Sequence, residues 1–166
     1  MKAIVINEFG GPEVFVEAEV PKPELRDGHL LVRVKASSVN PVDYKVRAGL
    51  IPPITPKFPA VLGCDVAGVV DEVGAGVTDF SVGDEVYFCA GSPDGIGGAL
   101  AEFCLVDAAQ VAKKPQLLGF EEAAALPLVM ITAWDGLIDR ADVGPGMKVL
   151  VHGATGGVGH AAVQLV

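Results

Sequence analysis

Apolar and polar residues alternate in short runs through the first hundred residues, and Gly or Pro separates one run from the next. Alternation with a period of two is typical of a strand that buries one face. It is clearest from Val14 to Val20, where Val and Ala occupy the even positions and Phe and Glu the odd ones. Many short strands with turns between them favour a barrel or a sandwich over a parallel sheet. The predicted strands are Lys2–Asn7, Val14–Val20, Leu30–Ser37, Val66–Val73, Glu85–Phe88 and Ala101–Val106.

One short helix interrupts these strands. Asn40 is a residue type that caps helices, and Pro41 suits the first helical position, where its missing N–H has no partner to lose. The pair predicts a helix over Val42–Ala48 that ends at Gly49. Residues 51–59 contain four prolines and therefore predict an extended surface loop.

The pattern changes near Gly119, after which Ala and Leu recur at helical spacing. We place a domain boundary within residues 115–126, which divides the chain into residues 1–122 and 123–166. The apolar run Val149–His152 has no alternation, as in a parallel strand buried on both faces. A Gly-rich turn and the start of a helix follow it. We expect Trp134 and His152 to be buried.

The turn has the pattern Ala154-x-Gly156-x-x-Gly159, placed between a predicted strand and a predicted helix. Glycines there let the backbone approach a pyrophosphate, and the helix N-terminus offers unpaired N–H groups to the anion. A structural turn without a ligand would read the same way, and the first glycine of the usual fingerprint is alanine here. The candidate cofactor-binding residues of the turn are Ala154, Gly156, Gly157, Val158 and Gly159.

Composition excludes several classes of function. The net charge is −9 and no basic cluster exists, so a nucleic-acid partner is not expected. The three cysteines stand at wide spacings, which supports neither a disulfide framework nor a zinc ribbon. No apolar run reaches the roughly 18 residues of a membrane span. The first residues lack the basic and long apolar regions of a signal peptide, so we expect a cytoplasmic protein.

Five ordered segments resemble the zinc-independent, quinone-oxidoreductase-like branch of the medium-chain dehydrogenase/reductase superfamily. The resemblance implies a mainly β, GroES-like barrel followed by the first β-α unit of a Rossmann α/β domain, in a chain that is truncated. It also implies a small-molecule substrate and, for the full-length protein, a homodimer. The segments are ASSVNPVDYKVRAG, FPAVLGCDVAGVVDEVGAGVTDFSVGDEV, GALAEFCLV, EEAAALPLVMITAWDGL and the AxGGVG turn.

The zinc alcohol dehydrogenases of this superfamily carry the signature G-H-E-x-x-G-x5-G-x-x-V, and this chain departs from it where the metal chemistry lies. Cys64 stands in place of the ligand His and Asp65 in place of the Glu. By the same resemblance Asn40 replaces the first catalytic Cys, and the third ligand falls near Leu128. Catalytic zinc takes three protein ligands and a water. We therefore expect no metal.

Zinc-free relatives reduce quinones or C=C bonds conjugated to a carbonyl, and the resemblance implies that reaction here, with NADPH, or alternatively NADH, as cofactor. It places Asn40 and Thr132 beside the nicotinamide, and Cys64 and Asp65 in the substrate cleft. Two alternatives stay open: Asn40 could serve as the helix cap as well, and the sequence favours a structural carboxylate, satisfied by hydrogen bonds, at Asp65. Tyr44 is the candidate proton donor, although some quinone reductases have their tyrosine one position later, where this chain has a lysine. Asn40 and Tyr44 are thus the catalytic candidates.

Three alternatives stay open on the sequence. The protein could be a zinc-type alcohol dehydrogenase, or a non-catalytic protein that binds the cofactor for a structural or sensing role. The 166 residues by themselves could also be inactive. Fold resemblance supports a reaction class only, because function depends on the site.

Overall fold

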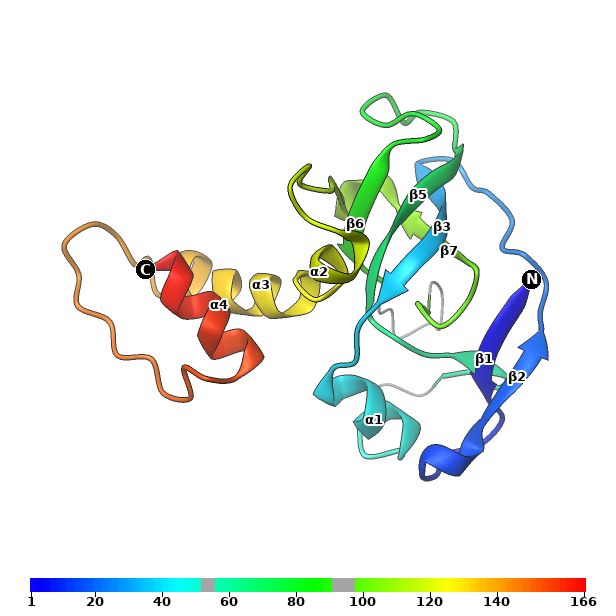
Figure 1. Cartoon of the computed structure of the whole chain (residues 1–166), viewed down its shortest axis with the longest axis horizontal. Coiled ribbons are helices and arrows are strands. Elements are labelled where there is room, and N and C mark those ends of the chain that lie inside the picture. The colour runs from blue at the N-terminus through cyan, green and yellow to red at the C-terminus, as the bar shows by residue number, and fades with distance from the viewer. Residues whose placement is uncertain (52–55, 91–97) are drawn as a thin grey trace.

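A computed structural model describes residues 1–51, 56–90 and 98–166. Its strands form two antiparallel sheets, which together make one barrel-like body (Figure 1). The strands are β1 (Lys2–Ile6), β2 (Phe15–Glu19), β3 (His29–Ser37), β4 (Ala60–Val61), β5 (Asp65–Val73), β6 (Glu85–Cys89), β7 (Phe103–Asp107) and β8 (Val111–Lys113). The helices are α1 (Pro41–Arg47), α2 (Phe120–Ala124), α3 (Pro127–Trp134), its π-helical extension η3 (Asp135–Arg140) and α4 (Gly157–Leu165), with 3-10 turns η1 (Pro12–Val14) and η2 (Ala108–Gln110).

The larger sheet has the order β7-β3-β5-β6-β8 and the smaller one β2-β1-β4. The two long strands β3 and β5 pair at the centre of the larger sheet, from Leu30 opposite Val73 to Ser37 opposite Val66. Their apolar side chains build the main core. Its buried members are Leu30, Val32, Val66, Val70, Val86, Phe88, Ala90, Ala99, Cys104 and Val106.

Gly68 lies in β5 where this strand meets β3 most closely. A Cβ atom at this position would overlap the carbonyl oxygen of Arg33 and lie 2.7 Å from a methyl of Val32. The absence of a side chain is therefore required by the approach of two backbones, and the fold has no room for alanine there. This explains structurally why the glycine persists where the metal ligands of the signature do not.

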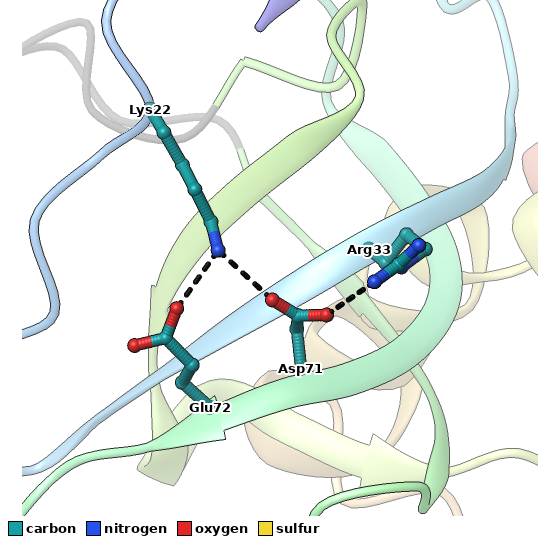
Figure 2. A network of polar contacts seen from close by, with 4 residues as sticks. All are labelled: Lys22, Arg33, Asp71 and Glu72. Atoms are coloured by element: carbon teal, nitrogen blue, oxygen red, sulfur yellow. Dashed lines mark hydrogen bonds and ion pairs between the residues drawn. The ribbon is translucent and has the colours of Figure 1, made fainter.

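Four charged side chains fasten the segment between β2 and β3 to the larger sheet (Figure 2). Lys22 of that segment donates to Asp71 at 2.9 Å and to Glu72 at 2.8 Å, both on β5. Arg33 of β3 donates to the other oxygen of Asp71 at 2.7 Å. Both cations also lie over the ring of Phe103, at 4.4 and 5.3 Å from its centroid. Asp71 is thus shared by two cations.

The helices α2 and α3 lead away from the strands, and α4 packs along α3 (Figure 1). Ala133 of α3 meets Ala161 and Ala162 of α4 in a small core of their own. None of the helices that the structure describes has the length and apolar character needed to cross a membrane.

All six strands predicted from the pattern are confirmed within one or two residues at most ends, as is the helix capped by Asn40. The pattern missed β4 and β8, which have two and three residues. Of the predicted loop over residues 51–59, residues 52–55 lie outside the described residues.

The strand predicted over Val149–His152 is not formed: these residues carry no strand or helix. An extended segment becomes a strand only when a neighbour takes its hydrogen bonds, and no described strand lies beside this one. Its apolar side chains are consequently uncovered, with Leu150 79% exposed. The burial expected for Trp134 and His152 was wrong, since both are exposed.

Candidate cofactor and substrate site

A buried carboxylate, Asp65, is the centre of the candidate site. It is the first residue of β5 and has no exposed surface. Its Oδ2 accepts hydrogen bonds from Ser38 Oγ and Asn40 Nδ2, each at 2.9 Å. Its Oδ1 accepts one from the backbone N–H of Leu128, also at 2.9 Å. One carboxylate therefore joins β5, the residues before α1 and the first turn of α3.

Two opposing effects act on this carboxyl group. Burial raises the pKa of Asp65, because the interior disfavours the charged form. The hydrogen bonds from Asn40, Ser38 and Leu128 lower it, and the net direction is upward. The three donors replace part of the hydration that the carboxylate gives up on burial.

Asn40 begins α1 as its N-cap residue, but its side chain makes no cap hydrogen bond. Instead the Asp43 carboxylate accepts a hydrogen bond from the Asn40 backbone N–H at 2.7 Å. The Asn40 amide nitrogen donates to Asp65 and, at 3.3 Å, to Ser38. Both N–H groups of the Asn40 amide are thus engaged within the protein.

Cys64 lies one residue before Asp65, and its thiol donates to Asp43 Oδ1 at 3.2 Å. A hydrogen bond with Cys89, burial and the Asp43 carboxylate raise the pKa of the Cys64 thiol. Among the described residues, no three His, Cys, Asp or Glu side chains are arranged to hold a metal ion.

The structure does not bring the two remaining candidates, Tyr44 and Thr132, into the cluster around Asp65. Tyr44 is 46% exposed on α1, and no hydrogen bond joins its hydroxyl to a described residue. Thr132 is exposed on α3, where its Oγ1 donates to the backbone oxygen of Leu128 at 2.7 Å. Thr132 is therefore linked to the Asp65 cluster through Leu128 alone.

The glycine-rich turn forms as predicted and leads directly into α4. Its N-cap, Gly156, provides no side-chain cap, so the first N–H groups of α4 have no side-chain partner from that residue. A Cβ atom on Gly159 would overlap the Gly153 carbonyl oxygen and lie 2.7 Å from the Ala154 Cα. The turn is thus closed so tightly that only glycine fits at position 159. Ala154 and Val158 lie within this turn and first helical turn.

The turn also touches α3. A Cβ atom on Gly157 would lie 3.1 Å from a methyl group of Val129, the residue that follows Leu128. The start of α3 consequently lies between the Asp65 cluster on one side and the glycine turn on the other.

Sequence reasoning missed Ser38 as part of this site, because it belongs to a pair of serines with no distinguishing context. The sequence favours a structural role for Asp43, a bond to a neighbouring backbone group, and its carboxylate does accept from the Asn40 N–H. Spacing is the signal: Asp43 lies three residues after the cap position, where a carboxylate can reach back to the cap N–H.

Comparison with known proteins identifies the family of this chain and similar solved structures. Residues 26–116 match the family described as "Alcohol dehydrogenase GroES-like domain". The chain is 42% identical to the "Chloroplast envelope quinone oxidoreductase homolog" of Arabidopsis thaliana, over 99% of this chain and 52% of that protein. It is 39% identical to the "NADPH-dependent alkenal/one oxidoreductase, chloroplastic" of the same plant, over 99% of this chain and 44% of that protein.

A similar solved structure is that of an alcohol dehydrogenase superfamily protein from Novosphingobium aromaticivorans. It is 46% identical, has a TM-score of 0.94, and the match covers 99% of this chain and 49% of that one. The chain therefore spans about half the length of the relatives that it matches.

Proposed function

The chain belongs to the alcohol dehydrogenase GroES-like family, in the quinone-oxidoreductase-like branch of the medium-chain superfamily, and from this we propose that the full-length protein is an NADPH-dependent reductase of quinones or carbonyl-conjugated C=C bonds that works without zinc. By full-length protein we mean the natural polypeptide that contains these 166 residues. In this proposal residues 1–122 belong to the catalytic barrel, and residues 123–166 begin the nucleotide-binding domain.

The observation that carries the proposal is the hydrogen bonding at the three positions that correspond to zinc ligands. Asn40 and Leu128 both present N–H donors there, and both donate to Asp65. Cys64 is a thiol that donates to a carboxylate. Protein zinc ligands are thiolates, imidazoles and carboxylates; the Leu128 side chain offers none of these, Asn40 offers only an amide whose nitrogen faces Asp65, and Cys64 alone is too few. The chemistry of this donor set favours a reaction in which no metal polarises the substrate.

The chain's residues fit a dinucleotide at the glycine turn. The closed turn at Gly159 and the first turn of α4, which Gly156 leaves without a side-chain cap, form a cradle for a pyrophosphate. When bound, NADPH supplies the hydride. Two names among the relatives, quinone oxidoreductase and NADPH-dependent alkenal/one oxidoreductase, support the cofactor and the substrate class.

The proposed reaction needs no metal ion. A hydride adds to the carbon β to the carbonyl, and a proton adds to the α carbon, so that NADPH, a proton and an enone give NADP⁺ and the saturated ketone. Asn40 would lie on the nicotinamide side of the bound cofactor, with Thr132 as the second residue there. Tyr44, whose hydroxyl is accessible, is the proposed proton donor. Cys64, which is half-buried, lies on the substrate side of the site, whereas Asp65 has no exposed surface and supports the site through its neighbours.

Activity and metal content of the purified full-length protein test this proposal. We expect NADPH oxidation with a quinone or a 2-alkenal, slower oxidation of NADH, and far less than one zinc per chain by elemental analysis. Addition of a chelator should leave the rate unchanged. Stoichiometric zinc together with alcohol-dependent reduction of NADP⁺ would instead identify a zinc-type alcohol dehydrogenase. Cofactor binding without any turnover would identify a non-catalytic binding protein.

A further inference from the structure

We propose that Asp65 is a positioning residue for hydride transfer: its carboxylate holds Asn40 of the barrel and the first turn of α3 in one fixed arrangement. The inference rests on the proposed function, since it assigns Asp65 a part in that reaction. Asp65 acts through its neighbours and needs no contact of its own with the transferred hydride.

The two oxygens of this carboxylate face two different parts of the molecule. Oδ2 holds Asn40, with Ser38 closing a triangle because it donates to Asp65 and accepts from Asn40. Oδ1 holds the backbone N–H of Leu128, 63 positions further along the chain. Because both oxygens belong to one rigid group, α3 cannot shift relative to Asn40 without breaking a buried hydrogen bond.

Leu128 in turn fixes the residues on the cofactor side. The Thr132 hydroxyl donates to the Leu128 carbonyl, and the neighbouring Val129 packs next to Gly157 of the glycine turn. The arrangement of the first turn of α3 is thereby transmitted both to Thr132 and to the cradle proposed for the pyrophosphate.

The apolar contacts near Asp65 do not fix the orientation of the helices as its hydrogen bonds do. Ala123 and Ala124 of α2 pack on Ala67 of β5. Methyl groups on methyl groups stabilise the contact but fix an orientation poorly, because dispersion is not directional. The three hydrogen bonds of the fully buried Asp65 provide the geometry that hydride transfer requires.

The test compares Asp65→Asn with Asp71→Asn in the full-length protein. Both substitutions replace a carboxylate by an amide of the same shape on the same strand, but Asp71 lies in the surface network of Figure 2. An amide at position 65 keeps one oxygen and turns an NH₂ group toward an N–H donor, so at least one hydrogen bond is lost. Ser38→Ala is the milder variant, because it removes one donor and leaves the carboxylate in place.

Three measurements are made on each variant: kcat and KM for NADPH with a 2-alkenal, the kinetic isotope effect with NADPH deuterated at the transferred position, and hydrogen exchange of the Leu128 amide. For Asp65→Asn we expect kcat to fall about tenfold or more. The isotope effect should rise, the KM should change about twofold at most, and the Leu128 amide should exchange faster. Asp71→Asn should keep the wild-type kcat and isotope effect.

If Asp65→Asn does not fold, Ser38→Ala decides, and we expect its kcat to fall several-fold with Leu128 protection retained. A folded Asp65→Asn with wild-type kcat and isotope effect would overturn the inference, as would an unaffected Ser38→Ala where only that variant folds. If the wild-type protein reduces neither quinones nor enones, the proposed function fails. Unchanged Leu128 exchange in Asp65→Asn would then separately show that Asp65 does not hold α3.

Discussion

At the scale of single residues, two glycines of the same turn make different demands on the fold. At Gly159 an added Cβ atom overlaps the Gly153 carbonyl oxygen, whereas at Gly156 the nearest atom, the same oxygen, lies 3.5 Å away in ordinary contact. Gly159 is required by the turn itself. Gly156 is free to serve a ligand.

We therefore expect Gly159→Ala to destabilise the full-length protein by about 1–3 kcal/mol, because the turn must open to admit the methyl group. Gly156→Ala should leave the melting temperature nearly unchanged but weaken NADPH binding about tenfold or more, since a lost hydrogen bond to a charged group costs about 1.5–3 kcal/mol. Thermal unfolding by circular dichroism and titration of NADPH fluorescence measure the two effects. Wild-type affinity in Gly156→Ala would show that the pyrophosphate does not lie on this glycine.

Asp65 marks the limit of reasoning from single residues. As a carboxylate beside Cys64 it could be assigned to a cleft, but its role depends on donors 25, 27 and 63 positions away along the chain. No local pattern relates Leu128 to Asp65. The hydrogen bond exists because α3 begins where β5 begins, which is a property of the tertiary structure.

At the scale of elements, the network of Figure 2 fastens the segment between β2 and β3 to the larger sheet. Hydrogen bonds from Arg33 and then Lys22 lower the pKa of Asp71. A carboxylate with a lowered pKa contributes stability above its ordinary pKa of 3.8, and this contribution is lost as the pH falls through its value in the folded protein.

Asp71→Asn should accordingly lower the free energy of unfolding at neutral pH by about 0.5–1 kcal/mol, the usual range for ion pairs near the surface. The difference from the wild type should shrink in high salt and disappear as the pH falls below the ordinary range of aspartate. Urea unfolding as a function of pH and salt measures it. A difference that persists unchanged in acid would mean that packing, not charge, is what the substitution disturbs.

The strands show which elements a pattern can reveal. Short apolar runs bounded by Gly and Pro located all six predicted strands, although β2, where the alternation is clearest, has no buried residue and β5 begins with four buried residues in a row. The pattern missed β4 and β8 because two or three residues are too few to show a period. The apolar run also predicted a strand over Val149–His152 that is not formed. An apolar run indicates that a segment can be buried on both faces, but it does not show whether a neighbouring strand is present.

At the scale of the whole molecule, the region of α3, α4 and the loop between them leaves many apolar side chains uncovered. Those exposed by half or more are Ile131, Trp134, Met147, Leu150, Val163 and Val166. Exposed apolar side chains in this number favour association with another surface.

Expressed by itself, the polypeptide of residues 1–166 should therefore self-associate and should not oxidise NADPH. Sedimentation velocity over a range of concentrations should show a weight-average sedimentation coefficient that rises with concentration. Replacing Met147 and Leu150 by Asp should reduce this rise, because it places charge in the most exposed part of the loop. A monodisperse, cooperatively melting and active monomer would show that this surface is not a contact surface and that the division into domains is wrong.

The sequence by itself determined the strands of the barrel, the helix after Asn40, the glycine turn before α4 and the resemblance to zinc-free reductases. These features depend on period, capping and turn chemistry, which act between residues close together along the chain. The tertiary structure alone decided that Asn40, Ser38 and Leu128 meet on Asp65, and that Val149–His152 is uncovered. Those outcomes depend on which distant segments come into contact, and hydrogen bonds and burial are settled only by that contact.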